Sequence, residues 1–379
     1  MPKWLDSDSA LAAFVGSLPA GQPVALDTEF DWTKTYYPVL ALLQIGTDRE
    51  RIGVADALAI HDWRPLRDLL AADDRQIILF SGHNDLPLLV HTCGGPEACL
   101  PKNLFDVQLA SVFCDGESVS PSLKSVVQAQ LGIELDKHET RSDWTKRPLT
   151  ESQLAYAAGD VALLPELALL FADKLAENGN AAAFQEEMSL WEKPETYAET
   201  PVELAWKRFK NFNILKTNEI RMRVRTLAAW REATARQKNL PRNWILSDGQ
   251  INWLANKNPQ NGSQMAAMPP SGHGAGRHHH DAILAALHNA TPAPEDRKIL
   301  SVRPTLRGKL NMMKERLAGL VSSRAKTCHI PEELLASRRE LEALATDSIM
   351  GLPRRESRLL TGWRAALLQP VLDEILNGK

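Results

Sequence analysis

The sequence predicts an α/β domain, in which helices flank a mixed sheet, followed by two small all-α domains. Three observations lead to this fold class. Strand-like and helix-like stretches alternate through the first two hundred residues, strand patterns disappear beyond residue 201, and the second half carries a weak internal repeat at an offset of 90 residues. Alternating strands and helices are typical of a sheet with helices packed on its faces. We expect domains at 1–195, 201–292 and 293–379.

The first domain opens with apolar runs that have the length and composition of buried strands. They cover residues 23–30, 40–47, 51–57 and 75–82, and a stretch with helical spacing, 63–72, separates the third from the fourth. Farther along, one long helix is predicted over 150–179. Thr150 and Gln153 have the spacing of a capping box at its start, and Gly179 follows its last apolar turn.

The second half reads as helical throughout. A polar stretch with prolines at 192–201 predicts a linker, and helices are expected over 221–239 and 248–258. The repeat pairs residues of the same kind: Pro241 with Pro331, Ser247 with Ser337, Ile251 with Leu341, Leu254 with Leu344, and Ala255 with Ala345. Two related helical domains would explain this pairing.

Composition restricts the class of protein. The 379 residues contain no run of eighteen apolar side chains, and the N-terminus lacks the basic-then-apolar pattern of a signal peptide. The four cysteines form no CxxC pair, which favours reduced thiols over a disulfide or a metal site. We therefore expect a cytoplasmic monomer without a membrane segment or an obligate protein partner.

The net charge of −3 conceals an asymmetry between the two halves. Residues 1–200 contain 15 Lys and Arg against 31 Asp and Glu, whereas the remainder contains 29 against 16. An acidic module joined to a basic one suggests that the basic part meets a polyanion. Two solvated surfaces of opposite sign would be the alternative explanation.

Two acids interrupt the first apolar run. Asp27 and Glu29, in VALDTEFDW, alternate with Leu26 and Thr28, so both carboxylates point to one face of the predicted strand. Like charges on one buried face repel, and burial raises their pKa. A solvated strand end would avoid this problem, and a divalent cation would remove it.

Further acids favour the cation. Asp85 follows a buried strand and lies in the first turn of a helix, while Tyr156 and Asp160 are four residues apart and share one helix face. Carboxylates from one strand and two helices can converge on two metal ions. Such a pair generates a hydroxide and stabilises the leaving oxygen of a phosphodiester.

At this point the sequence resembles a known family. The segments LDTEF, HNDLPLL and YAAGDVALL look like the three exonuclease motifs of the DEDDy 3′-5′ exonucleases. The sequence that flanks them resembles the ribonuclease D family in particular. The second half is similar to the tandem HRDC (helicase and RNase D C-terminal) domains of that family. The resemblance implies a ribonuclease H-like exonuclease domain and two Mg²⁺ or Mn²⁺ ions.

The family pattern carries over residue by residue. It implies that Asp27, Glu29, Asp85 and Asp160 bind the metal ions and that Tyr156 positions the attacking water. All these positions match, and Pro87 in the second motif lies in a first helical turn, where proline is tolerated.

Residues around the motifs have further expected roles. Asp106 matches a recurring family acid, either supporting the site or simply beginning a helix. Phe30 can pack against a terminal base or belong to the core, and Asp31 is expected at the surface. Around Trp144, the loop HETRSDWTKRPL brings the cations Arg141 and Arg147, which suit an RNA backbone and a stacked base; a basic loop that balances an acidic pocket is the alternative.

In the helical half, a dense set of cations is expected to follow phosphates: Lys207, Arg208, Lys210, Arg221, Arg223, Arg225, Arg231 and Arg236. Together with the motifs, they predict a 3′-5′ exoribonuclease that releases 5′-mononucleotides, and the resemblance points to tRNA precursors and other structured RNAs as substrates. A DNA 3′-5′ exonuclease and a non-catalytic RNA-binding module are the alternatives.

Overall fold

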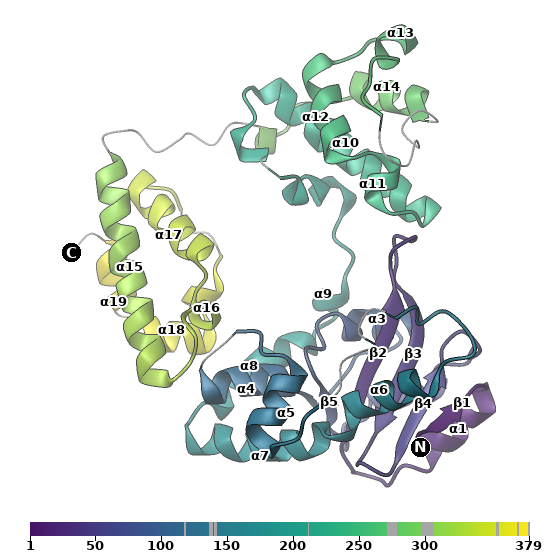
Figure 1. Ribbon diagram of the computed structural model, residues 1–379. Coiled ribbons are helices and arrows are strands. Elements are labelled where there is room, and N and C mark those ends of the chain that lie inside the picture. The colour runs from purple at the N-terminus through teal and green to yellow at the C-terminus, as the bar shows by residue number, and fades with distance from the viewer. Residues whose placement is uncertain are drawn as a thin grey trace. The chain divides into compact units, whose positions relative to one another are not determined.

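The computed structural model describes the chain except residues 117–118, 136–138, 140–141, 211, 271–278, 297–305, 354–355, 370 and 378–379. Its contacts divide the chain into two units (Figure 1). The first comprises Met1–Phe30, Leu40–Ala198 and Val302–Lys379, and the second comprises Asp31–Val39 and Glu199–Ser301. The exonuclease motifs all lie in the first unit.

A six-stranded mixed sheet organises the first unit. Its strands are β1 (Lys3–Leu5), β2 (Val24–Asp31), β3 (Val39–Gly46), β4 (Ile52–Asp56), β5 (Ile77–Leu79) and β6 (Leu104–Asp106), in the order β1-β4-β3-β2-β5-β6. Pairing is parallel between β1 and β4, β2 and β5, and β5 and β6, and antiparallel between β3 and β4. The predicted mixed sheet is confirmed.

The four predicted strands lie at the centre of the sheet because they are largely apolar and buried, apart from the acids of β2. Every residue of β4 is buried, as are the last seven of β3. The strands β1 and β6 were not predicted. Each has three residues, which is too short to show a period, and neither lies inside a longer apolar run as the equally short β5 does. Each pairs on one side only, at an edge of the sheet.

Helices cover the sheet. They are α1 (Asp8–Gly16), α2 (Arg64–Leu70), α3 (Asp85–Thr92), α4 (Val107–Asp115), α5 (Leu123–Leu131), α6 (Glu151–Ala162), α7 (Leu164–Glu177), α8 (Ala181–Trp191) and α9 (Pro194–Tyr197). Among them, α6 packs on β4, α7 on β5, and α8 on β6. The same apolar cluster therefore holds sheet and helices together.

The single helix predicted over 150–179 is wrong in one respect, because Leu163 separates it into α6 and α7. Pro165 lies at the start of α7, and a proline has no N–H for the preceding turn and clashes with its carbonyl. The predicted capping box is present: the Thr150 side chain accepts from the Gln153 backbone N–H, and the Gln153 side chain accepts from that of Thr150.

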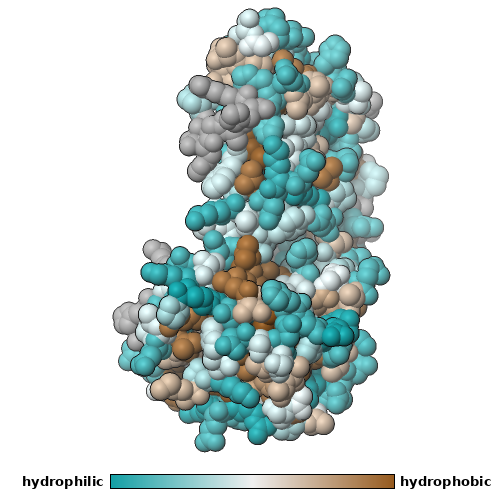
Figure 2. All heavy atoms as spheres, turned by 90° about the vertical axis from the view of Figure 1, so that its right-hand side faces the viewer, coloured by the Kyte–Doolittle hydropathy of each residue, from teal (hydrophilic) through white to brown (hydrophobic). Residues whose placement is uncertain are grey.

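The stretch Glu151–Glu177 is long and apolar enough to cross a membrane, judged by length and composition alone. In the fold, however, α6 lies on β4, and α7 packs against α4 and β5. Its apolar side chains thus serve the core of the first unit. On the face drawn in Figure 2 the surface is mainly hydrophilic, with hydrophobic residues in small groups.

Two helical regions follow. One contains the 3-10 helices η1 (Val202–Arg208), η2 (Phe212–Ile214) and η4 (Pro294–Asp296) with α10 (Asn218–Lys238), α11 (Arg242–Ile245), α12 (Asp248–Lys257), α13 (Gly262–Met265) and α14 (His280–His288). The other contains η6 (Arg358–Leu360) with α15 (Arg307–Cys328), α16 (Glu332–Leu335), α17 (Arg338–Met350), α18 (Gly362–Leu368) and α19 (Val371–Leu376).

The internal repeat has a structural counterpart. The helices α10, α11 and α12 are followed 90 residues later by α15, α16 and α17 with the same kinds of caps. Asn239 ends α10 in the left-handed region at φ 48° and ψ 46°, and His329 ends α15 at φ 54° and ψ 40°. Ser247 and Ser337 each open a capping box, with Gln250 and Glu340 as partners. The domain boundaries themselves stay predictions.

The second helical region is part of the first unit. Trp363 at the start of α18 donates its indole N–H to Glu187 of α8 over 2.8 Å, and its ring lies 5.5 Å from that of Phe113. Gly116 ends α4 at φ 65°, where a Cβ atom would lie 2.5 Å from the carbonyl oxygen of His329. This close approach requires a glycine.

A buried carboxylate of the second unit, Glu232 of α10, joins several of its segments. Arg242 donates to both of its oxygens, at 2.5 and 2.8 Å, and Tyr36 of the segment 31–39 donates its hydroxyl over 2.5 Å. Burial alone would raise the pKa of Glu232, but the hydrogen bonds from Arg242 and Tyr36 outweigh it and lower that pKa to about 2. Glu232 thus stays ionised and binds the cations around it.

The capping boxes opened by Ser247 and Ser337 should contribute equally to stability. We expect Ser247→Ala and Ser337→Ala each to lower the free energy of unfolding by about 1 kcal/mol, because each leaves a helix N-terminal N–H without its acceptor. Urea unfolding followed by far-ultraviolet circular dichroism measures this. Ser189→Ala, whose hydroxyl only donates to a carbonyl of its own helix, is the matched control. An equal loss in the control would contradict the assignment.

Candidate active site

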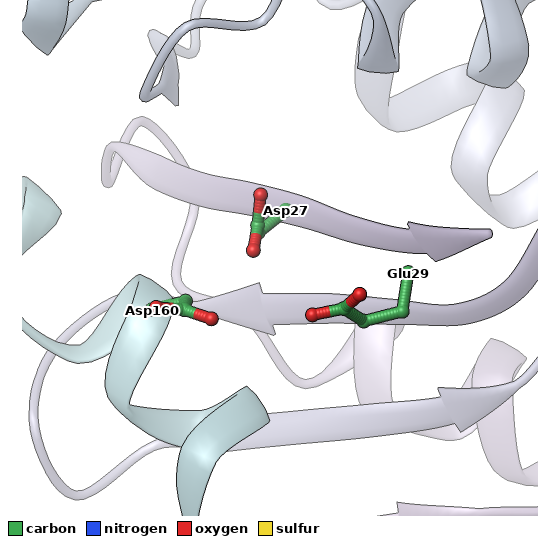
Figure 3. Close-up of side chains that lie close together, drawn as sticks. All are labelled: Asp27, Glu29 and Asp160. Carbon is green, nitrogen blue, oxygen red and sulfur yellow. The ribbon is translucent and has the colours of Figure 1, made fainter. Parts of the chain in front are cut away.

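Three carboxylates converge at the middle of the sheet. Asp27 and Glu29 project from β2 and Asp160 from α6, and each offers an oxygen atom within 4.8 Å of the other two (Figure 3). All three side chains are partly buried. The spacing predicted from the sequence, two positions on a strand and one on a helix, therefore produces one cluster.

Close packing of α6 against β3 places Asp160 near the strand. A Cβ atom at Gly46 of β3 would lie only 3.0 Å from Cγ2 of Val161, the residue after Asp160. A side chain at position 46 would require Val161 to move, so a glycine here allows the close approach of α6. Val161 and Ala157 are both fully buried, which fixes the rotation of α6.

Burial and mutual repulsion together raise the pKa values in the cluster. Burial raises the pKa of Asp27 well above its usual value, and the charges of Asp160, Asp85 and Glu29 raise it further. Burial, followed by the charges of Asp160 and Asp85, raises the pKa of Glu29 to about 8. Without a cation, the cluster therefore retains protons at neutral pH.

Asp85 begins α3, as the sequence predicted, and is only 8% exposed. Its charge is felt by both Asp27 and Glu29, so it borders the same cluster. The buried hydroxyl of Thr28 donates a hydrogen bond to Oδ1 of Asp85. Sequence reasoning missed this role of Thr28, which lies between the two acids of β2 but faces the other way, because no local pattern indicates it.

Asp106 connects the loop before α3 to the start of α4. Its Oδ1 accepts the backbone N–H of Leu109 over 2.7 Å and caps α4, while its Oδ2 accepts that of Gly82 over 2.8 Å. Burial raises the pKa of Asp106 to about 6, although these two hydrogen bonds oppose the shift. Asp106 is thus a helix cap that also holds the turn leading to Asp85.

Tyr156 lies one helical turn before Asp160. Its ring packs against that of Trp144, with centroids 5.8 Å apart. A cavity of about 210 Å³ opens beside this face of α6, lined by Tyr156, Gly159 and Asp160 together with Leu135 and Glu139. Asp160 is the member of the acid cluster that lines this cavity.

The residues proposed to bind substrate have different surroundings. Phe30 is half-buried and packs against the core, and Arg141 lies outside the described residues. Trp144 is only 5% exposed and supports Tyr156, so its ring does not offer a stacking surface to a base. Asp31 accepts the backbone N–H of Thr33 over 2.8 Å and takes no part in the cluster, as expected.

Arg147 makes structural contacts, and its expected role in binding RNA stays a prediction. Its Nε and one Nη2 hydrogen reach the carboxylate of Asp56 on β4, at 2.8 and 2.5 Å. The other donors reach the carbonyls of Ala41, Trp144 and Lys146. All five guanidinium N–H groups are thereby used, and they tie the loop before α6 to the sheet.

Most cations of α10 are also engaged within the second unit, contrary to the expectation that they follow phosphates. Arg221 is 1% exposed, and its guanidinium lies 4.5 Å from the Phe212 ring. The remaining pairs are Arg225 with Asp296, Arg231 with Asp248, Arg236 with Glu199 and Glu232, and Arg208 with Glu232, while Arg223 donates to the Ala255 carbonyl. Within the described part of the chain, only Lys207 and Lys210 of the predicted set have no such internal partner.

Comparison with known proteins agrees with the family resemblance of the exonuclease motifs. A family model described as 3′-5′ exonuclease matches residues 2–176, and a model of the HRDC domain matches residues 221–287. Ribonuclease D of Escherichia coli is 33% identical over 98% of both chains, and ribonuclease D of Desulfotalea psychrophila is 33% identical over 91% of both. The chain belongs to the ribonuclease D family.

The solved structures agree with this assignment. The crystal structure of E. coli RNase D superposes with a TM-score of 0.85 at 31% identity and covers 99% of this chain and 98% of its own. A protein from Bifidobacterium adolescentis shares the fold at a TM-score of 0.71. As a ribonuclease D family member, the chain is a hydrolytic 3′-5′ exoribonuclease that acts on RNA. One HRDC domain is matched; the second rests on the repeat described above.

The acid cluster fits the divalent metal ions on which this nuclease family depends. Carboxylate oxygens are the ligands preferred by hard divalent cations. The mutual repulsion among Asp27, Glu29 and Asp160 is the property that a bound cation relieves. In a metal-bound site, all three can be ionised at neutral pH.

Loss of the Arg147 clamp should lower stability. We expect Arg147→Gln to reduce the free energy of unfolding by about 2 to 4 kcal/mol, because it leaves the Asp56 carboxylate without its partner. Thermal unfolding measures this, and Lys146→Gln in the same loop is the control. If Arg147→Gln left the free energy of unfolding unchanged and raised the KM for RNA, Arg147 would be a substrate-binding residue.

The raised pKa of Glu29 predicts a pH dependence of stability in the absence of metal. The folded protein keeps a proton with a pKa of about 8 that the unfolded chain loses near 4.5. The free energy of unfolding should therefore fall as the pH rises through this range. Thermal unfolding in a chelating buffer between pH 5 and pH 8 tests this.

Glu29→Gln should make that dependence less steep, with Asp27 and Asp85 still contributing. Glu151→Gln, an exposed change on α6, should leave it intact. Added Mn²⁺ should raise stability most at the alkaline end, because the metal competes with the proton. The same slope in Glu29→Gln as in the parent protein would show that Glu29 does not cause it.

Proposed function

We propose that this exoribonuclease trims the 3′ ends of structured RNAs, tRNA precursors foremost, in the cytoplasm and as a monomer. We further propose that two Mg²⁺ or Mn²⁺ ions are held by Asp27, Glu29, Asp85 and Asp160. The observation that carries the proposal is the convergence of three carboxylates within 4.8 Å, with Asp85 beside them. The E. coli RNase D is an exoribonuclease involved in structured RNA processing, and we extend this substrate class to the present chain.

The bound metal ions would supply an ionised water at neutral pH and stabilise the charge on the leaving oxygen. The residues of this chain would orient the reactants around them. Tyr156 lies one turn from Asp160 on the same face of α6, where its hydroxyl can hold the attacking water by a hydrogen bond. Water hydrolyses the phosphodiester bond of the terminal nucleotide, and a 5′-mononucleotide leaves. The new 3′-hydroxyl end of the shortened RNA would then enter the site.

Supporting residues keep this arrangement rigid. Thr28 holds one oxygen of Asp85, so the carboxylate keeps one orientation before any substrate arrives. Asp106 holds the turn that precedes Asp85, and Trp144 holds the Tyr156 ring. Preorganised groups of this kind raise the rate because they need not rearrange during the reaction.

Substitutions at the cluster test the mechanism. On an RNA substrate with Mg²⁺ or Mn²⁺, Asp27→Asn and Asp160→Asn should lower kcat at least about a thousandfold, and Tyr156→Phe about a hundredfold. Mononucleotide release from a labelled RNA, separated by gel electrophoresis, measures the rates.

Asp31→Asn is the matched control, since Asp31 lies on the same strand but its carboxylate caps a turn. It should retain full activity. An active Asp27→Asn protein would exclude the proposed site, and equal rates on matched RNA and DNA oligonucleotides would widen the substrate class to both nucleic acids.

A further inference from the structure

We propose that Gln44 of β3 is a positioning residue of the active site, whose side-chain amide accepts a hydrogen bond from the indole N–H of Trp144 and donates one to the carboxylate of Asp160. The inference rests on the proposed function in one respect, that the acid cluster binds divalent metal ions. It gives a role to a side chain that lies outside the three exonuclease motifs.

The side chain of Gln44 faces α6. Two positions farther along β3, a Cβ atom at Gly46 would lie 3.0 Å from Val161 of α6, and side chains two positions apart on a strand share a face. Ile45 between them faces the opposite way, because it pairs with Gly53 of β4, where a Cβ atom would meet a side chain of α1. Gln44 therefore extends into the layer between the sheet and α6.

The acid cluster occupies the same layer. The strand β2 lies next to β3 in the sheet, and its two acids point toward Asp160 of α6 (Figure 3). Asp160 directly precedes Val161, the residue that packs over Gly46. The Asp160 carboxylate thus belongs to the part of α6 that lies over the end of β3 carrying Gln44.

The amide of Gln44 is buried without a partner. Gln44 is the one polar side chain of β3, and it is 0% exposed. Within the part of the chain that the structure describes, neither its Oε1 nor its Nε2 has a hydrogen-bond partner. Burying an unpaired amide is costly, and a leucine would fill the position without that cost. Packing of β3 alone therefore does not explain a glutamine.

Trp144 is the other described side chain of the first unit with a buried polar atom that lacks a partner. Its indole N–H is unpaired, while its ring packs on Tyr156 of α6. Trp144 is also linked to β3, because Arg147 donates both to its carbonyl oxygen and to that of Ala41. An indole can only donate, whereas an amide accepts and donates, so the unpaired groups of the two side chains are complementary.

One arrangement would satisfy all three unpaired atoms. When Trp144 donates to Oε1 of Gln44, the amide turns its Nε2 toward the acids, and Nε2 donates to Asp160. An amide suits this place because it supplies a donor without a charge, so it neither adds to the repulsion nor competes with a cation. Its hydrogen bond would fix the orientation of the Asp160 carboxylate, as outer partners of metal-binding residues commonly do.

The test compares Gln44→Leu with the parent protein as full chains and without RNA. The affinity for Mn²⁺, measured by isothermal titration calorimetry, should fall about tenfold, because the loss of a group that orients a metal ligand typically has at least this effect. The unfolding temperature in a chelating buffer should stay the same or rise, because leucine removes a buried unpaired amide. A purely structural glutamine would give the opposite result, lower stability with unchanged affinity, and that result would overturn the proposal.

Ile45→Leu is the matched control, since it changes a buried side chain on the other face of the same strand. It should leave the Mn²⁺ affinity unchanged. Trp144→Phe keeps the aromatic ring and removes the N–H, so it should also weaken Mn²⁺ binding. Combined with Gln44→Leu it should cause no further loss, because the two residues act through one hydrogen bond.

Three results would overturn the role of Gln44 while the metal site stands. They are a parental affinity in Gln44→Leu, an equal loss of affinity in Ile45→Leu, and additive losses in the double variant. If the parent protein itself binds no Mn²⁺, the proposed metal site fails and the role of Gln44 fails with it.

Discussion

Repulsion among carboxylates is the constraint on which the nuclease part of the structure depends. Asp27, Glu29, Asp85 and Asp160 are brought together by β2, α3 and α6, and burial makes each charge more costly. No single local element could place three carboxylates within 4.8 Å of one another with Asp85 near enough to raise the pKa of Asp27 and Glu29. The sheet can, because the free energy of its apolar core is available to oppose the repulsion until cations neutralise it.

Contacts made by residues outside the acid cluster determine where each acid lies. Gly46 allows α6 to approach the sheet, Thr28 fixes Asp85, and Arg147 ties the loop before α6 to Asp56 on β4. Each contact joins residues that are far apart in the chain: 57 residues separate Thr28 from Asp85, and 91 separate Arg147 from Asp56. A site assembled from three elements is therefore only as rigid as these long-range contacts.

The difference between local spacing along the chain and contacts between distant segments explains which features could be predicted. Asp27 with Glu29 and Tyr156 with Asp160 follow the local periods of a strand and a helix, so sequence spacing was sufficient to group them. The orientation of Asp85 by Thr28, and the use of Arg147 as a clamp, depend on pairings between distant segments that no local pattern encodes. The strands β1 and β6 could not be predicted for a related reason: outside a longer apolar run, three residues form a strand only by pairing with a neighbouring strand.

The charge of the helical half illustrates the same limit. Its excess of Lys and Arg suggested a broad RNA-binding surface, yet Arg221, Arg225, Arg231 and Arg236 bind groups of their own unit. Arginine is suited to such internal pairs because its planar fork makes several hydrogen bonds at once, whereas lysine is strongly hydrated and stays at the surface. Net charge therefore overstates the area available to RNA. The affinity for RNA should depend on the exposed cations rather than on the net charge of the region.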